Sequence, residues 1–116
     1  MDPVLAVRNL IARYAELIDL GDFAGVGQLF THCDVTTDLS DEVRRGAVLA
    51  QEQFESWTRR YPDNGTPHTK HVTTNLIIDV ADDGSAVKAR SYYTVCQQVE
   101  DLPLQPIIAG RYHDEF

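Results

Sequence analysis

The chain has 116 residues, a formal net charge of −8 and a sequence pI near 4.7. This length suits one domain, and 43% hydrophobic with 24% charged residues is an ordinary globular composition that forms a stable core without crosslinks. The acidic balance argues against nucleic acids and anionic membrane surfaces as partners, because both bind basic faces.

The sequence carries no sign of export. No apolar run is long enough to span a bilayer, and Met1-Asp2-Pro3 shows no basic region followed by an apolar stretch, as a signal peptide would. The two cysteines, Cys33 and Cys96, form no motif. We therefore expect reduced thiols in a cytoplasmic protein.

The first quarter of the chain is predicted to be helical. Residues 3–20 repeat apolar side chains at helical spacing, with Asp2 as the cap and Gly21 as the stop. The apolar positions are Val4, Val7, Ile11, Tyr14, Leu17 and Ile18. Asp22 then caps a short second helix from Phe23 to Phe30.

The middle of the chain mixes strand, loop and helix. Cys33 to Leu39 is rich in threonine and predicts a short strand, whereas Ser40 to Glu42 is polar and predicts a loop. Residues 46–60 predict a third helix, and residues 61–67 predict a turn-rich loop. The side chains expected on the buried side of the third helix are Val48, Leu49, Phe54 and Trp57.

The last part of the chain is strand-like. Residues 69–80 and 86–99 alternate around the turn Asp82-Asp83-Gly84, which is a hairpin pattern, and residues 107–116 begin a further strand. Helices first and antiparallel strands afterwards indicate an α+β fold in a single domain, residues 1–116. Because the last strand has no later partner, we expect C-terminal strands of the natural protein to be missing.

No motif of high specificity is present. The sequence contains no phosphate-binding loop, dinucleotide fingerprint or nucleophile elbow. Its four histidines lack zinc spacing, and His68 and His71 point to opposite faces of an extended segment. We therefore expect neither a metal ion nor an organic cofactor.

Asp19 is the first candidate for chemistry. It lies in the last turn of the first helix, where the helix dipole disfavours a carboxylate, and its neighbours are Leu17, Ile18 and Leu20. The dipole and desolvation both predict a raised pKa for Asp19 unless a cation compensates, as suits a group that handles protons. The alternative is an ordinary surface aspartate near a helix end.

His71 and Tyr14 are the other candidates. Alternation on the first long strand gives His71 a mixed polar and apolar face that suits a cavity wall; the alternative is a histidine satisfied at a strand end. The residues expected on that face are His71, Thr73, Asn75 and Ile77, and those expected to face inward on the next strand are Ser91, Tyr93 and Val95. Tyr14 is expected to border the same pocket, or to be a core aromatic with its hydroxyl at the rim.

Several segments resemble a known family. Ile11-Ala-Arg-Tyr-Ala-Glu-Leu-Ile-Asp-Leu-Gly-Asp-Phe23 resembles the opening helix of SnoaL-like proteins of the nuclear transport factor two-like superfamily. His71-Val-Thr-Thr-Asn-Leu-Ile-Ile78 is similar to their first long strand, and residues 89–93 and 110–116 are similar to the next two. The resemblance spans nearly the whole chain.

This resemblance implies a cone-shaped, curved antiparallel sheet packed on N-terminal helices, a cystatin-like α+β barrel with a pocket at its open end. It also implies a small apolar ring compound as ligand, no cofactor, and a homodimer or higher homo-oligomer that forms through the sheet. Members of the superfamily include scytalone dehydratase, bile-acid dehydratase, the lindane dehydrochlorinase and the small subunits of ring-hydroxylating dioxygenases.

The resemblance also implies roles for the candidate residues. In the dehydratases and the dehydrochlorinase, an aspartate at the end of the first helix pairs with a histidine on the first long strand, and Asp19 and His71 match those positions. Asp19 would orient His71 and stabilise its cation, His71 would move the proton, and Tyr14 would donate a hydrogen bond to a substrate oxygen. Dehydration is the reaction this favours, ahead of isomerisation and elimination.

Two departures leave other functions open. Several relatives place a second acid or histidine on the second long strand, where this chain has Val95 and Cys96, and final strands that carry an arginine in some relatives are absent. Tyr112, on the third long strand, receives no role. The alternatives are a non-catalytic small-ligand-binding module and a structural partner like a dioxygenase small subunit.

Overall fold

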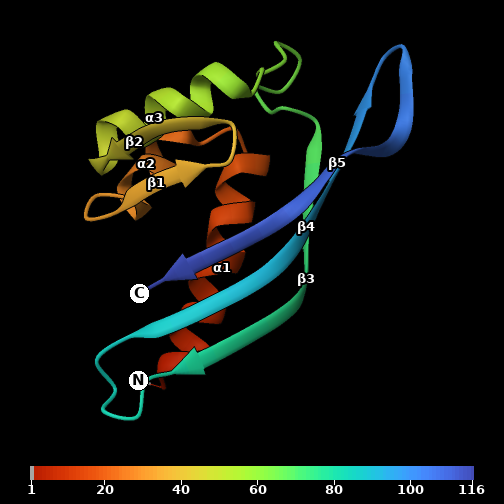
Figure 1. Cartoon of the computed structure of the whole chain (residues 1–116). Coiled ribbons are helices and arrows are strands. Elements are labelled where there is room, and N and C mark those ends of the chain that lie inside the picture. The colour runs from red at the N-terminus through yellow and green to blue at the C-terminus, as the bar shows by residue number, and fades with distance from the viewer. Residues whose placement is uncertain (1) are drawn as a thin grey trace. The chain divides into compact units, whose positions relative to one another are not determined.

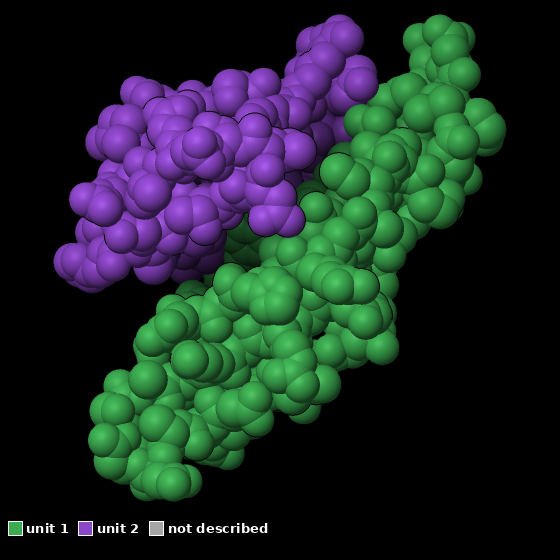
Figure 2. All heavy atoms as spheres, viewed as in Figure 1, with its two compact units in different colours: residues 1–16, 68–116 green, residues 17–67 purple. Residues whose placement is uncertain are grey.

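The computed structural model describes residues 2–116, and Figure 1 shows their helices and strands. In chain order these are α1 (Pro3–Asp19), α2 (Phe23–Leu29), β1 (Asp34–Thr37), β2 (Ser40–Arg45), α3 (Gly46–Trp57), β3 (Thr69–Val80), β4 (Val87–Val99) and β5 (Leu102–Glu115). The chain divides into two compact units, coloured separately in Figure 2: unit 1 is residues 1–16 with 68–116, and unit 2 is residues 17–67. Helices combined with antiparallel sheets confirm the α+β class.

Capping side chains and a glycine set the bounds of the first two helices. Asp2 Oδ1 accepts the Val4 N–H at 2.9 Å at the start of α1, and Asp22 Oδ1 accepts the Gly25 N–H at 2.9 Å at the start of α2. Gly21 has a φ of +76°, a left-handed conformation that glycine adopts without strain. These are the predicted caps and stop. In the described part of the chain, no helix combines the length and the apolar character needed to cross a membrane.

Unit 1 is built on a three-stranded antiparallel sheet in the order β3-β4-β5. The predicted hairpin joins β3 to β4, and Gly84 in its turn has a φ of +74°. The third strand begins at Leu102 instead of residue 107, because its pairing with β4 extends to Val99.

One face of this sheet is covered by the unit 1 part of α1, and we call it the helix-facing face (Figure 1). Val7 and Ile11 of α1 are 5% and 8% exposed, and they pack with Val87 and Ala89 of β4. The partly buried side chains beside this cluster are Leu76 and Ile78 of β3. The apolar stripe predicted for the first helix is therefore what joins that helix to the sheet.

A bulge at Asn75 changes which residues of β3 share a face. The register pairs on either side of it are Thr74↔Tyr92 and Ile77↔Arg90. Strand β3 thus holds one extra residue there, and Asn75 has a φ of +56°, which asparagine tolerates better than most residues. The prediction that Asn75 and Ile77 share the face of His71 is therefore wrong, and both side chains are exposed.

Unit 2 holds α2, α3 and the two-stranded β1-β2 sheet. The loop predicted at Ser40–Glu42 is wrong, since this segment begins β2 and pairs antiparallel with β1. Almost every β2 side chain is exposed, so no alternation of apolar residues marks the strand. In α3, Phe54 is buried as predicted, with Ala50 and Gln53 beside it. The side chains predicted to be buried but found exposed are Val48, Leu49 and Trp57.

Candidate functional site

The three residues predicted to carry chemistry lie in different parts of the fold. Tyr14 belongs to the unit 1 part of α1, and His71 lies on β3 of the same unit, with both side chains half-buried. Asp19 is the last residue of α1, as predicted, and its half-buried side chain belongs to unit 2. The structure shows which residues of unit 1 surround Tyr14 and His71. The pairing of Asp19 with His71 stays a prediction.

Three tyrosines gather on the helix-facing face of unit 1. The rings of Tyr14 and Tyr112 meet edge to face with centroids 5.8 Å apart, and their side chains share a hydrogen bond. Tyr112 also stacks on Tyr93, with centroids 4.4 Å apart and ring planes within 19°. Both geometries are favourable for aromatic pairs. This tyrosine cluster therefore holds the Tyr112 ring between two neighbours and its hydroxyl beside that of Tyr14.

The Tyr93 ring occupies the space where a side chain of residue 110 would lie, because residue 110 is glycine. The two residues are register partners across β4 and β5. A Cβ atom on residue 110 would lie 2.5 Å from both Cζ and the hydroxyl oxygen of Tyr93. The ring thus lies directly over the backbone of residue 110, and only glycine permits this approach.

Burial and neighbouring groups keep the Tyr14 hydroxyl protonated. Burial raises the pKa of Tyr14 well above its usual 10.0, and Tyr112, Asp114 and Tyr93 raise it further. Burial also raises the pKa of Asp114, and the electrostatic interaction with His113 partly opposes that rise. Tyr14 is therefore a neutral phenol, able to donate a hydrogen bond, at any pH near neutrality.

Ser91 lies opposite Tyr112 in the register of β4 and β5. Its side chain is 3% exposed, and among the described residues its Oγ has no hydrogen-bond partner. Buried hydroxyls are almost always satisfied, so an orphaned one needs an explanation. The predicted inward orientation of Ser91, Tyr93 and Val95 is confirmed.

The sheet register places His71 next to the tyrosine cluster. His71 pairs with Val95, and Thr73 pairs with Tyr93, so His71 lies one step along the helix-facing face from Tyr93. Residues two apart on a strand are separated by roughly 7 Å. An imidazole thus shares a half-buried face with the tyrosine cluster.

No lysine or arginine of unit 1 is buried on this face. Each of these side chains is exposed to solvent: Arg8, Arg13, Lys70, Lys88, Arg90 and Arg111. Among the described residues, no group of three or more His, Cys, Asp or Glu side chains lies close enough to share a metal ion.

The sequence did not reveal that Tyr112 and Ser91 lie opposite each other on β5 and β4. Alternation on β5 puts Gly110, Tyr112 and Asp114 on one face, and this was readable from the sequence. The register of β5 against β4 was not, because it depends on the irregularity between Val95 and Cys96. The signal that was available is the glycine two residues before the tyrosine, which marks a close approach to the backbone.

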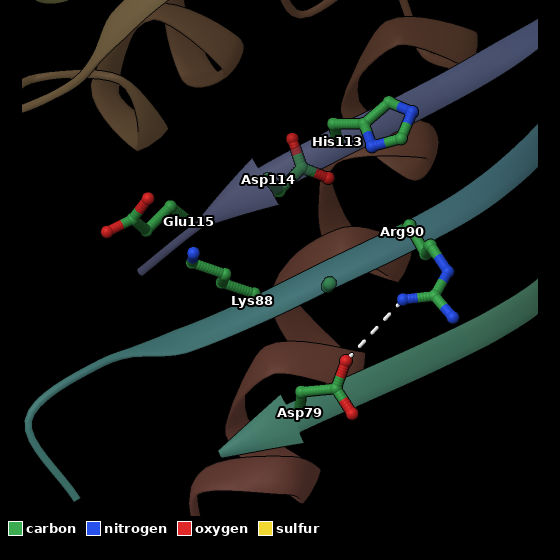
Figure 3. A pocket seen from close by; sticks show the side chains of 7 residues that line it. Asp79, Lys88, Arg90, His113, Asp114 and Glu115 are labelled. Carbon is green, nitrogen blue, oxygen red and sulfur yellow. Dashed lines mark ion pairs between the residues drawn. The ribbon is translucent and has the colours of Figure 1, made fainter. Parts of the chain in front are cut away.

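A shallow depression of about 300 Å³ lies on unit 1 (Figure 3). It is lined by Asp79, Lys88, Ala89, Arg90, His113, Asp114 and Glu115. Arg90 and Asp79 form an ion pair of 3.5 Å there, and both side chains are exposed. An exposed pair of this kind contributes at most about 1 kcal/mol. None of the three predicted site residues lines this depression, whose charged side chains form a solvated surface.

Comparisons with known proteins show the family and the fold of this chain. The model of the SnoaL-like domain family matches residues 2–116, whereas the comparison with curated proteins gives no match. A solved structure of a variant of Rv3472, a protein of unknown function from Mycobacterium tuberculosis, is 25% identical with a TM-score of 0.76. That alignment covers 97% of this chain and 64% of the other, so this chain spans less than two thirds of that relative.

Two further structures share the fold. A putative scytalone dehydratase from Novosphingobium aromaticivorans is 18% identical with a TM-score of 0.72, over 97% of this chain and 71% of that one. A protein from Catenulispora acidiphila, solved in complex with S-DNPA, is 23% identical with a TM-score of 0.75, over 99% of this chain and 81% of that one. At these identities the likeness establishes the fold.

Proposed function

The chain belongs to the SnoaL-like domain family, and from this premise we propose that it is a cofactor-independent lyase or isomerase of the dehydratase type. The proposed substrate is a small, mostly apolar ring compound of the β-hydroxyketone type. It carries a carbonyl group and, on the β carbon, a hydroxyl group. His71 is the proposed base, Asp19 its partner carboxylate, and Tyr14 a hydrogen-bond donor to the carbonyl oxygen.

One observation carries this proposal. His71 lies half-buried on the helix-facing face of unit 1, one register step from a cluster of tyrosines that includes Tyr14. A base beside phenol donors matches the two demands of enolate formation, which are removal of a carbon-bound proton and stabilisation of the oxygen on which charge develops.

The proposed reaction balances without a co-reactant. An imidazole nitrogen of His71 takes the proton from the carbon next to the carbonyl, and the electron pair of that bond moves onto the carbonyl oxygen. Tyr14 donates a hydrogen bond to this oxygen. The enolate then re-forms the carbonyl and expels the hydroxyl group, which takes the proton back from His71 and leaves as water. The product is a conjugated enone.

Asp19 is proposed to act through His71. A carboxylate that accepts a hydrogen bond from one imidazole nitrogen fixes the tautomer and stabilises the cation formed when the other nitrogen takes a proton. This role rests on the family resemblance and on the position of Asp19 at the end of α1.

The test of this function is turnover of cyclic β-hydroxyketones, followed by the near-ultraviolet absorbance of the enone product. We expect wild type and His113→Gln to be active, since His113 is an exposed residue of β5, and His71→Gln to be slower by about 10²–10⁴-fold. Equal turnover in His71→Gln would refute the assignment of the base.

A non-catalytic ligand-binding module is the second candidate, favoured by the relative solved in complex with S-DNPA. The same assay separates the two candidates. If a ketone binds to the wild-type protein, as measured by calorimetry, but is not converted to the enone, the result would support the binding module and contradict the lyase.

We also propose a homodimer that forms through the outer side of the unit 1 sheet. Large apolar side chains are exposed on the outer side of β3 and β4, among them Val72, Ile77 and Tyr92, each more than 40% exposed. Burial of such side chains between two copies would be favourable. Light scattering on the eluting protein is expected to give twice the 13.0 kDa chain mass, and a monomer at micromolar concentration would contradict the dimer.

A further inference from the structure

We propose that Asn64 is a site of spontaneous deamidation, at which the side-chain amide is converted to aspartate and isoaspartate by way of a cyclic succinimide. Asn64 lies in the loop between α3 and β3 and is followed by Gly65. The reaction needs no enzyme, and its only co-reactant is water. It concerns residues of unit 2 alone and does not depend on the proposed function.

The residue that follows Asn64 distinguishes it from the other asparagines. The chain has three asparagines, of which Asn9 and Asn75 are followed by leucine. A leucine side chain hinders the approach of its own peptide nitrogen to the preceding amide, whereas glycine has no side chain and moves freely. All three asparagines are exposed to solvent. Exposure alone therefore does not separate them, and the glycine does.

The loop directs the Asn64 amide toward the peptide group that it has to meet. Asn64 Oδ1 accepts hydrogen bonds from the Thr66 N–H at 3.0 Å and from the Thr66 hydroxyl at 2.8 Å. The side chain is therefore folded forward along the chain, as in other turns that asparagine forms. Gly65 has a φ of +74°, and apart from its chain neighbours no heavy atom lies within 4 Å of a Cβ atom built on it. Residue 65 thus has room to move while the ring closes.

One hydrogen bond opposes the reaction. The Gly65 N–H donates to the Tyr61 carbonyl at 2.8 Å, and the nitrogen must leave this bond and lose its proton before it attacks. Breaking one hydrogen bond of ordinary strength slows a reaction by about two- to tenfold. We therefore expect deamidation in the folded protein, at a lower rate than in a peptide of the same sequence.

The reaction balances with water as the only added reactant. The deprotonated nitrogen of Gly65 attacks the side-chain carbonyl carbon of Asn64, the bond from this carbon to the amide nitrogen breaks, and ammonia leaves. Water then opens the succinimide ring at either carbonyl carbon. One opening gives aspartate with the main chain unchanged. The other gives isoaspartate, in which the main chain runs through the former side chain and is longer by one methylene group.

The two products differ in their effect on the turn that ends α1. The Gly65 carbonyl oxygen packs directly on Gly21, since a Cβ atom on residue 21 would lie 2.4 Å from this oxygen. An extra methylene group one residue before Gly65 displaces the oxygen, whereas aspartate adds only a negative charge. We therefore expect isoaspartate to weaken the packing of this loop on Gly21, and aspartate to leave it in place.

The test is incubation of the folded protein at mildly alkaline pH in water labelled with heavy oxygen, followed by tryptic digestion in ordinary water and mass spectrometry. Label marks amides lost during the incubation and not during digestion. We expect it in the peptide 61–70, which contains Asn64, and not at Asn9 or Asn75. In Gly65→Ala, conversion of Asn64 should fall to the level of those two controls. The excised peptide 61–70 should convert about two- to tenfold faster than the folded protein.

Urea denaturation tests the effect of the product on the loop. Wild type aged in this way should unfold at a lower urea concentration than fresh protein. Ageing should not change Asn64→Gln, because its longer side chain closes such a ring far more slowly. Fresh Asn64→Asp carries the new charge without the extra methylene group, and it should unfold as fresh wild type does.

Three results would overturn the assignment of Asn64. These are an intact Asn64 in folded protein under conditions that convert the excised peptide, equal label at Asn9 or Asn75, and conversion in Gly65→Ala as fast as in wild type. If wild type loses the Asn64 amide but keeps its urea midpoint, the expected displacement of Gly65 from Gly21 is wrong.

Discussion

Replacing Asp19 with asparagine is expected to lower kcat/KM for the β-hydroxyketone that wild type turns over by about 10²–10⁴-fold, at unchanged stability. Asparagine has nearly the same shape but cannot stabilise an imidazolium, and its amide favours the wrong tautomer of His71. The loss should appear in kcat, because the carboxylate is needed when His71 becomes a cation and not when the substrate binds.

The control for Asp19→Asn is Glu16→Gln. Glu16 is an exposed carboxylate on the same helix, where it pairs with Arg13. Glu16→Gln removes the same charge from the helix as Asp19→Asn does, three residues before Asp19. We therefore expect this variant to turn over substrate as wild type does. If both variants lost activity alike, the net charge of the helix would explain the effect, and the specific role of Asp19 would be wrong.

Replacing Gly110 with alanine is expected to destabilise the protein by about 1–3 kcal/mol, the usual cost of forcing an extra methyl group into a packed site. The new Cβ would lie 2.5 Å from both Cζ and the hydroxyl oxygen of Tyr93, so that ring must leave its stack on Tyr112. Urea denaturation followed by circular dichroism measures the change.

Two further variants show whether the ring contact is the cause. Ala109→Val adds bulk at the adjacent, exposed position of β5, and we expect little change in stability. Tyr93→Ala removes the ring, so adding Gly110→Ala to it should cost much less than Gly110→Ala costs alone. Equal costs in the two backgrounds would contradict the contact.

The regular elements of unit 1 could be predicted because their local signals are strong. The apolar stripe from Val7 to Ile11 defines α1, and the alternating runs around Gly84 define the β3-β4 hairpin. The bulge at Asn75 could not be read from period-two alternation, since an extra residue reverses the faces after it. The three consecutive apolar residues that follow, Leu76 to Ile78, are the trace it leaves in the sequence.

Unit 2 was less predictable for a related reason. Strand β2 is almost wholly exposed, so its residues follow no apolar pattern. In α3, Val48 and Trp57 are exposed while the polar Gln53 is buried, so hydrophobicity alone gives the wrong face of the helix. Burial there depends on tertiary packing, which outweighs composition.

The individual residues of the candidate site could be predicted from the sequence, but the arrangement of their side chains around one another could not. The sequence indicated that His71 and Tyr14 face inward, and both are half-buried. Their surroundings depend on the long-range register that brings Tyr93 and Tyr112 together, and no local pattern specifies such a register. The pairing of Asp19 with His71 came from the family resemblance and is the step on which the proposed chemistry depends.

A double-mutant cycle tests that step most directly: kcat/KM is measured for wild type, Asp19→Asn, His71→Gln and the double variant, on one substrate and at one pH. We predict that the double variant is no slower than His71→Gln alone, since a carboxylate that acts through the imidazole has nothing to act on once the imidazole is gone. Losses that multiply in the double variant would show two independent residues and contradict an Asp19–His71 catalytic pair.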